Sequence, residues 1–352
     1  MFIAAFGPPC PTTKWGLHLL RTIVDVALGE HDFITSSSLA QLKAEWPKRT
    51  HEHLVYFSDC PEAAIVDLFA RSESPIIVFT EEPRDVVAIT AKEKNISLVD
   101  AIRSTSKHFA ALHDLFVKSN TNIFRRPTRP TSLRKGIELF ADTYAIKLDA
   151  KMIDVISAKL CKLHRSDEVA DMLLAIDQFA GENKRGDLIY NTTGSDKALL
   201  EAVIDPLAGV IAGQELVAVT WPKAMFFDSD KKGEAFGSPI ELIGQTRQLT
   251  YGPYLYLPRG SWRAIFFLAF KNSRSTNFLR ADILCNVKEI MGVGDFETIG
   301  DGNFTVELPF QVGEPIFPLE ARLSLRGGAI EGSLDLLKIE MRRDTSSAAE
   351  ET

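Results

Sequence analysis

The sequence predicts two domains of different class: an α/β domain with a parallel sheet, followed by an all-β antiparallel sandwich. The chain has 352 residues, enough for two domains of roughly 150 residues each. In the first part, short continuous apolar segments alternate with helical patterns, whereas from about residue 215 one strand pattern follows another. We therefore expect an α/β domain over 1–190, a linker helix over 191–214, a β-sandwich over 215–342 and a disordered tail over 343–352.

Three short apolar segments are the predicted strands of the first domain: Phe2–Phe6, His53–Phe57 and Pro75–Thr80. Continuous apolar strands separated by helices are typical of a parallel sheet that is covered on both faces. Apolar residues recur at helical spacing over Trp15–Leu28, so the chain opens with a strand, a loop and a helix. A second helix is expected from Asp59 to Phe69, and mostly helix from Ser97 to Ala180.

The second domain shows strict alternation of apolar and polar residues. Asn303–Val312 and Leu319–Arg326 follow this pattern, which predicts strands with one face in the core and the other in solvent. Glycine-containing turn signals recur between such segments, as in an antiparallel β-sandwich. We expect Ala198–Ile211 to form one helix that links the two domains.

Composition excludes several function classes. A net charge of -7 disfavours a general role in binding nucleic acid or anionic membranes. No apolar segment approaches the roughly 20 residues of a membrane span, and Phe2–Phe6 is too short for a signal peptide, so we expect a cytoplasmic protein. The four cysteines lie far apart without a C-x-x-C pair, which predicts no metal site. We expect His108 and His113 to have surface or capping roles.

The loop between the first predicted strand and helix is a candidate anion site. Free backbone N–H groups and the positive end of the helix dipole meet at such a loop. It reads GPPCPTTKW, from Gly7 to Trp15. It is not a Walker A motif, because that pattern needs Gly and Lys where Thr12 and Thr13 stand, and Lys14 comes one position late. Thr12 and Thr13 suit capping of the helix and binding of an anion equally well.

This loop resembles the 5′-phosphosulfate loop of the sulfotransferases, a P-K-x-G-T-T-W type motif at the same strand-to-helix junction. The matching residues are Pro8, Thr12, Thr13 and, one residue late, Trp15. The resemblance implies a sulfotransferase-like P-loop fold. In an active protein it would also imply the donor 3′-phosphoadenosine 5′-phosphosulfate, with Thr12, Thr13 and Lys14 holding the transferred group.

Two later segments fall where that family has its own. VYFSDCP, Val55–Pro61, is similar to the segment that supplies a catalytic His or Glu ahead of a Pro, and Asp59 stands in that place. FTEEPRDVV, Phe79–Val87, is similar to the R-N-P-x-D-V segment, with matches at Pro83, Asp85 and Val86. The resemblance implies that Asp59 is the general base. The residues themselves favour another interpretation, a helix N-cap two residues before Pro61, since a lone Asp with a pKa of about 4 is a weaker base than His.

The departures from the family concern the donor site. Pro9 and Pro11 stand where the family has a cation and a flexible Gly, and each proline removes an N–H donor. Glu81 replaces the arginine that binds the 3′-phosphate, and Ile89 replaces a serine that assists it. A carboxylate repels a phosphate, so the site is weakened.

Other cations could restore some of the lost charge. Lys14 and Arg84 are candidates for anion or donor binding. A cluster of Arg125, Arg126 and Arg129 could fold over the site, but we expect it to be a solvated loop.

The C-terminal part has its own resemblance. The segment Leu249–Phe270, which contains TYGPYLYLPRGSW, looks like the carbohydrate-binding-module-like sandwich appended to bacterial glycan-modifying enzymes. Tyr254 and Tyr256 are the candidates for stacking on sugar rings. Tyr251, Trp221 and Trp262 are further candidates, although Trp262 is expected instead to open a buried strand. For Tyr254 and Tyr256, packing between the domains is an equally open interpretation.

Two hypotheses about function follow. The first, which we favour because of the loop prolines and Glu81, is a glycan-associated binding or regulatory protein with a degenerate sulfotransferase-like site. Its expected partner is a polysaccharide or a glycan-synthesis protein. The alternative is a divergent sulfotransferase or other group-transfer enzyme acting on a bacterial polysaccharide hydroxyl, with Asp59 as the base. A cofactor, 3′-phosphoadenosine 5′-phosphosulfate, is expected only under the alternative.

Overall fold

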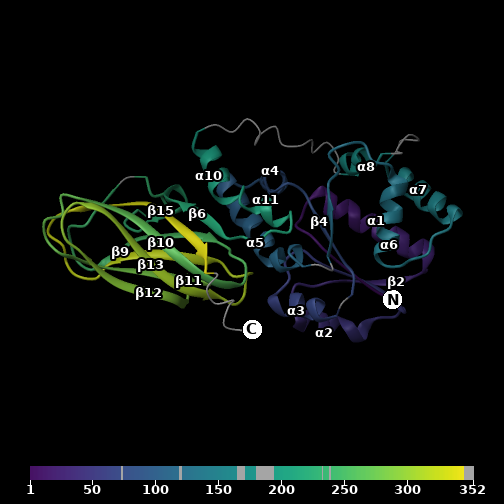
Figure 1. Cartoon of the computed structure of the whole chain (residues 1–352), viewed down its shortest axis with the longest axis horizontal. Helices are drawn as coiled ribbons and strands as arrows, with labels where there is room; N and C mark the ends of the chain where they lie inside the picture. Colours follow the sequence, from purple (N-terminus) through teal and green to yellow (C-terminus); the bar gives the residue numbers. More distant parts are fainter. Residues whose placement is uncertain are drawn as a thin grey trace. The chain divides into compact units, whose positions relative to one another are not determined.

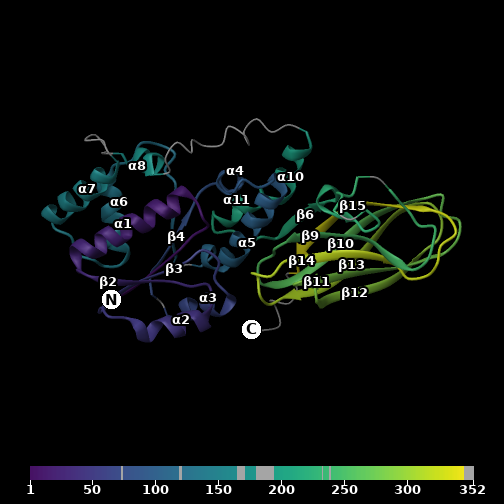
Figure 2. The ribbon, with the colours of Figure 1, turned by 180° about the vertical axis from the view of Figure 1, so that it is seen from behind.

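A computed structural model describes residues 1–72, 74–118, 121–164, 171–179, 194–231, 233–237 and 239–344, with the backbone alone for 161–164. The chain divides into two compact units. Unit 1 consists of Met1–Thr192 with Val210–Gln214, and unit 2 of Thr193–Gly209 with Glu215–Thr352. Figures 1 and 2 show the elements of both units from opposite sides.

Unit 1 contains a parallel sheet of five strands in the order β2-β3-β1-β4-β5. The strands are β1 (Phe2–Phe6), β2 (His31–Thr35), β3 (His53–Ser58), β4 (Ile76–Thr80) and β5 (Thr121–Arg125). The predicted parallel sheet is confirmed, and the three predicted strands are its central members. Mostly helix was expected over Ser97–Ala180, with an interruption from Phe124 to Pro130, and the strand β5 just before and into this interruption was not predicted. This edge strand, like β2 at the other edge, has only one buried residue, so its apolar signal is weak.

Helices cover both faces of this sheet (Figure 1). They are α1 (Pro11–Ala27), α2 (Leu39–Glu45), η1 (Trp46–Lys48), α3 (Ala63–Arg71), α4 (Pro83–Lys94), α5 (Leu98–Phe116), α6 (Leu133–Thr143), α7 (Ala150–His164) and α8 (Met172–Phe179). The expected helix start at Asp59 is wrong: α3 begins at Ala63, and Glu62 is its N-cap residue.

The core between the sheet and α1, α6, α7 and α8 contains an extended cluster of buried apolar residues. Trp15, Leu19 and Ile23 of α1 are fully buried there. At Gly16 the helix lies so near the sheet that a Cβ atom would come within 2.3 Å of Cε1 of Phe79. Only glycine allows this approach, which seats α1 directly on β4.

The opposite face of the sheet packs against α3, where Phe69 contacts three aromatic rings. Its ring stacks on Phe2 at 5.6 Å and on Tyr56 at 5.4 Å between centroids, and meets Phe6 edge-on at 5.3 Å. Helix α5 packs beside α3 and α4. It buries His108 and His113, so the expectation of surface or capping roles for these two histidines is wrong.

Unit 2 is an antiparallel β-sandwich, as predicted. One sheet has the order β13-β10-β15-β6, with β8 paired to β15, and the other has the order β12-β11-β14-β9-β7. The elements are β6 (Ala218–Pro222), η2 (Lys223–Met225), β7 (Phe227–Asp228), β8 (Ile240–Glu241), β9 (Arg247–Leu255), β10 (Gly260–Lys271), β11 (Asn277–Cys285), β12 (Glu289–Thr298), β13 (Gly302–Val312), β14 (Leu319–Leu325) and β15 (Ser333–Arg343). Strands β13 and β14 match the two alternating segments predicted from the sequence.

Two tryptophans belong to the interior. Trp221 and Trp262 are fully buried, and the indole Nε1 of Trp262 donates a 2.9 Å hydrogen bond to the carbonyl oxygen of Pro258. Neither ring presents a face to solvent, so neither can stack on a sugar in this conformation.

The segment between the two predicted domains is not one helix. Instead, α10 (Ser195–Val203) and α11 (Leu207–Val210) are separate. Pro206 lies between them, and a proline cannot donate the backbone hydrogen bond that would continue a helix. Residues 345–352 of the predicted tail lie outside the described residues.

Several absences hold for the part of the chain that the structure describes. No helix there is long and apolar enough to cross a membrane. No group of three or more His, Cys, Asp and Glu side chains could hold a metal ion within the same ranges. The described cysteine side chains, Cys10, Cys60 and Cys285, are free thiols.

Candidate functional site

The loop between β1 and α1 closes on itself through Thr13. The hydroxyl of Thr13 donates a 2.6 Å hydrogen bond to the carbonyl oxygen of Pro8 and lies 3.2 Å from Sγ of Cys10. Cys10 is the N-cap residue of α1, and its side chain makes no capping hydrogen bond. A Cβ atom at Gly7 would lie 2.7 Å from Oγ1 of Thr13. The loop therefore needs glycine at this position to fold so tightly.

The N-terminus of α1 is occupied by a carboxylate from the same chain. Both the backbone N–H and the hydroxyl of Thr12 donate to Oε1 of Glu81, at 2.9 Å and 2.6 Å. Glu81 directly follows β4, and only 2% of its surface is exposed. The free N–H groups and dipole of a helix N-terminus favour an anion at this place. In this protein the carboxyl group of Glu81 takes this place.

Burial governs the acid–base properties of this cluster. It raises the pKa of Glu81, an effect that the Thr12 hydrogen bonds and the nearby Arg126 oppose. Burial, and next the charge of Glu81, also raise the pKa of the Cys10 thiol. A thiol with a raised pKa stays protonated at neutral pH, so Cys10 is not poised as a nucleophile.

Arg126 reaches the same cluster from the segment after β5. One of its guanidinium nitrogens lies 3.7 Å from Oε1 of Glu81, and the other pairs with Asp177 of α8. The side chain is 8% exposed. The expectation of a solvated loop is therefore wrong for Arg126, which folds over the site. Its charge is already balanced by two carboxylates of unit 1.

The remaining predicted anion-binding residues are Lys14 and Arg84. Nζ of Lys14 is 2.8 Å from both carboxylate oxygens of Glu93 in α4, so its charge is paired across the two helices. Arg84 is half-buried in the first turn of α4. Thr12 and Thr13 thus both form hydrogen bonds within the loop cluster, whereas the charge of Lys14 is paired with Glu93.

Asp59 follows β3 and is half-buried. Because α3 is capped at Glu62, the N-cap interpretation of Asp59 is wrong. Its backbone carbonyl accepts a 2.9 Å hydrogen bond from Nδ1 of His108 in α5. Burial lowers the pKa of His108, so the imidazole is neutral at pH 7, and donation from Nδ1 leaves the lone pair on Nε2.

His108 is the functional candidate that sequence reasoning missed. Its Nε2, which carries the lone pair, is the atom that would accept a proton in general-base catalysis. Its helical neighbours Thr105, Phe109 and Leu112 are all buried, and this spacing was the available signal that His108 faces the interior. Proximity to Asp59 depends on the packing of α5 against the sheet, which no local pattern reports.

The two candidate sugar-binding tyrosines flank Leu255 at the end of β9. Leu255 is 1% exposed, whereas Tyr254 and Tyr256 are half-buried. The ring of Tyr254 lies 6.2 Å from that of Phe227 and 6.4 Å from that of Tyr251. Tyr254 therefore belongs to an aromatic cluster on one sheet of the sandwich.

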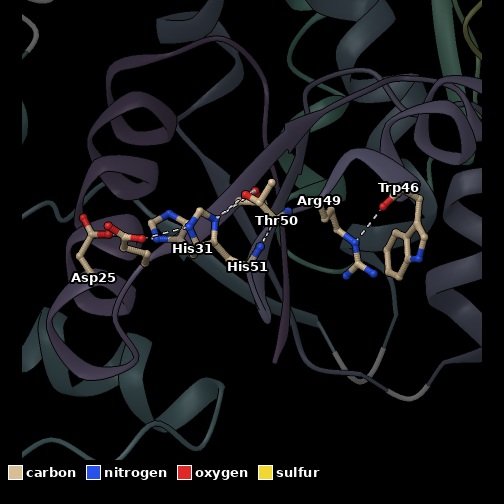
Figure 3. A network of polar contacts seen from close by, with 8 residues as sticks. Asp25, His31, Trp46, Arg49, Thr50 and His51 are labelled. Carbon is tan, nitrogen blue, oxygen red and sulfur yellow. Dashed lines mark hydrogen bonds and ion pairs between the residues drawn. The ribbon is translucent and has the colours of Figure 1, made fainter.

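A second polar network lies where β2 and β3 begin (Figure 3). This is the amino end of the strands, whereas the loop follows the carboxyl end of β1. Asp32 accepts hydrogen bonds from the backbone N–H groups of Thr50 and His51, at 2.9 Å and 2.8 Å. His51 also lies 3.1 Å from a carboxylate oxygen of Glu30 through Nε2. These contacts tie the start of β2 to the turn before β3, which indicates a structural role.

No protein-family model matches the sequence, and no curated protein matches it. Among solved structures, a mouse sulfotransferase complexed with PAP aligns with 57% of this chain and 81% of its own, at 12% identity and a TM-score of 0.40. A carbohydrate-binding module in complex with β-1,4-galactotriose covers 36% of this chain and 88% of its own, at 12% identity and a TM-score of 0.24.

A further solved structure aligns with part of this chain. It is the C-terminal CBM6 module of a laminarinase from Zobellia galactanivorans, which covers 36% of this chain and 99% of its own. The identity is 11% and the TM-score 0.25. All three likenesses are remote, with identities of 11–12% and TM-scores below 0.5.

Proposed function

We propose that this chain is a glycan-associated binding or regulatory protein whose sulfotransferase-like site is degenerate. The observation that carries the proposal is the carboxylate of Glu81, which accepts two hydrogen bonds from Thr12 at the N-terminus of α1. This is the position at which a helix would otherwise hold the phosphate or sulfate of a donor.

A nucleotide donor meets three obstacles at this loop. The donors of Thr12 are already satisfied by Glu81, so a ligand would have to displace a buried carboxylate. Pro9 and Pro11 supply no N–H groups. The cations that could attract a phosphate are paired as well, Lys14 with Glu93 and Arg126 with Glu81 and Asp177.

The glycan half of the proposal concerns the sandwich. Tyr254 and Tyr256 are half-buried and amphipathic, and the exposed part of such rings packs well on the C–H face of a sugar. A polysaccharide or a glycan-synthesis protein is the proposed partner. A location in the cytoplasm stays a prediction.

Calorimetric titration with adenosine 3′,5′-bisphosphate tests the degenerate site. We expect a dissociation constant above about 100 μM, which corresponds to a binding free energy weaker than roughly -5.5 kcal/mol. Low-micromolar binding to the wild-type chain would contradict the proposal. If such binding appeared, Lys14→Ala should weaken it more than Arg84→Ala, because Lys14 lies in the first turn of α1 itself.

One observation favours the alternative, a group-transfer enzyme that uses 3′-phosphoadenosine 5′-phosphosulfate and a polysaccharide hydroxyl. The hydrogen bond from Nδ1 of His108 to the backbone carbonyl of Asp59 brings a neutral imidazole to the residue proposed as the base. Transfer of labelled sulfate from this donor to a polysaccharide, abolished by either Asp59→Ala or His108→Ala, would support the enzyme. Absence of transfer at millimolar donor would support the degenerate site.

A further inference from the structure

A groove of about 490 Å³ lies in unit 2, at the end of the sheet where β11 begins and β12 and β14 end. Figure 2 shows these three strands side by side. Phe278, Asp295, Glu297, Arg326 and Gly327 line it. Tyr254 lies at the opposite end of this sheet from the groove. The last residue of β11, Cys285, pairs with Leu319 of β14, and Leu319 pairs with Leu255, the neighbour of Tyr254.

The register of the strands puts the groove on the outer face of the sandwich. Phe278 is paired with Glu297, and Arg280 with Asp295, and directly paired residues point to the same face of a sheet. The residues between them face the core: Leu279 is 1% exposed. Phe278, by contrast, is 48% exposed. The alternation of inward and outward residues along β11 therefore exposes the aromatic ring of Phe278 to solvent.

The ring of Phe278 is held in place from one side. A Cβ atom at Gly327 would lie 3.2 Å from Cδ2 of Phe278, so the backbone of Gly327 approaches the ring closely. The N–H of Arg326 donates a 2.7 Å hydrogen bond to the carbonyl of Phe278, which fixes the turn onto β11. A ring positioned in this way offers a firm surface to a ligand, at little entropic cost on binding.

Charged groups with available hydrogen-bonding atoms surround this ring. Asp295 is held by Arg280 through two hydrogen bonds of 2.8 Å and 2.7 Å, which lower the pKa of Asp295. Within the described ranges, the side chains of Glu297 and Arg326 make no hydrogen bond or ion pair. The groove thus offers an acceptor group, Glu297, and a donor group, Arg326, beside an exposed ring, and the charge of Arg326 also acts on Asp295.

The charges of the groove balance. Asp295 and Glu297 are opposed by Arg280 and Arg326, so an anionic ligand gains no net attraction. An exposed aromatic face suits the C–H face of a pyranose, and a carboxylate with a guanidinium suits its hydroxyl groups as acceptor and donor. This chemistry selects an uncharged sugar.

We propose that this groove binds a neutral oligosaccharide, with Phe278 as the stacking platform and Glu297 and Arg326 as hydrogen-bonding partners. The inference rests on the proposed glycan-associated function and deepens it. It assigns the binding site to an end of the sheet opposite to Tyr254 and Tyr256.

The test is affinity electrophoresis of the full chain in gels that contain β-1,4-galactan, laminarin or xylan, with polygalacturonate as the anionic comparison. We expect retardation by at least one neutral polysaccharide and an increase of the dissociation constant by about tenfold or more in Phe278→Ala. The matched control is Phe317→Ala, which removes a ring of similar exposure, 40%, from another part of unit 2. Glu297→Gln should also weaken retention. Phe278→Ala and Glu297→Gln should both keep the melting temperature of the wild type.

The outcomes separate the groove from the broader proposal. Retention that survives Phe278→Ala but is lost in the Tyr254→Ala/Tyr256→Ala double variant would overturn the groove and leave the glycan-associated function intact. Retention by polygalacturonate alone would contradict the proposal that the ligand is neutral. Failure of every polysaccharide to retard the wild-type chain would overturn the groove and the glycan half of the proposed function together.

Discussion

Thr12 and Glu81 are 69 residues apart in the sequence, and the hydroxyl of Thr12 donates a 2.6 Å hydrogen bond to a carboxylate oxygen of Glu81. The contact joins the first turn of α1 to the residue that follows β4. An internal carboxylate therefore satisfies this helix end.

Glu81→Ala should open the N-terminus of α1 to an external anion. The N–H and hydroxyl of Thr12 lose their acceptor, and Arg126 keeps its charge beside them. We expect inorganic sulfate to bind at least about tenfold more tightly to the variant than to the wild type, measured by calorimetric titration. Glu82→Ala is the control, because Glu82 is exposed and makes no capping hydrogen bond. Equal sulfate affinity in the two variants would argue against the occupied-site interpretation.

Gly16→Ala should destabilise unit 1. The added methyl group would come within 2.3 Å of a ring atom of Phe79, and overpacking in a core costs about 1–3 kcal/mol. This cost outweighs the gain of about 0.5–1 kcal/mol that alanine brings to a helix interior. Denaturant unfolding of the full chain measures the difference. Phe79→Leu in the same chain should recover part of the loss, and a stabilising Gly16→Ala would refute the close packing.

The network of Asp32 and His51 should stabilise the fold most in mildly acidic solution. Hydrogen bonds, above all from the backbone of His51, lower the pKa of Asp32 to about 2, so its contribution is present above about pH 4 and is lost as the pH falls toward 2. The hydrogen bond to Asp32 raises the pKa of His51. Its contribution is therefore complete below about pH 6.5 and is lost as the pH rises through the higher folded-state value.

The melting temperature of His51→Gln measures this dependence. The deficit relative to the wild type should be largest between about pH 4 and pH 6.5 and smaller at pH 9. Asp32→Asn should instead remain less stable than the wild type at pH 9. The hydrogen bonds from the backbone N–H groups to the charged carboxylate of Asp32 do not depend on the charge of the histidine. A deficit of His51→Gln that grows with pH would contradict the assigned sign.

The sandwich is predicted to fold as a separate fragment. A fragment of residues 215–342 should be soluble and unfold cooperatively on heating, and one of residues 194–344 should melt at a higher temperature. The longer fragment keeps α10, which packs on β6, and the 2.8 Å ion pair between Arg343 and Glu215. Scanning calorimetry of both fragments provides the comparison. An insoluble longer fragment would show that the sandwich needs unit 1 for its core.

The class of each unit could be predicted from the sequence because it depends on local periodicity. Side chains repeat every 2 residues on a strand face and every 3.6 on a helix face, so the central strands β1, β3 and β4 and the alternating strands β13 and β14 were recognisable. The edge strands β2 and β5 bury too little surface to show this pattern. The split between α10 and α11 was visible at Pro206, although the apolar spacing suggested a single helix.

The sequence by itself determined the strand–loop–helix unit, the prolines and Glu81 that limit its loop as an anion site, and the alternating strands of the sandwich. Only the tertiary structure decided which groups meet. The parallel register aligns the carboxyl ends of β1, β3 and β4, and this alignment brings Glu81 onto Thr12. The packing of α5 against the sheet likewise brings His108 to Asp59. Contacts between such distant residues depend on strand order and helix placement, which are properties of the whole fold and leave no trace in the local pattern of residues.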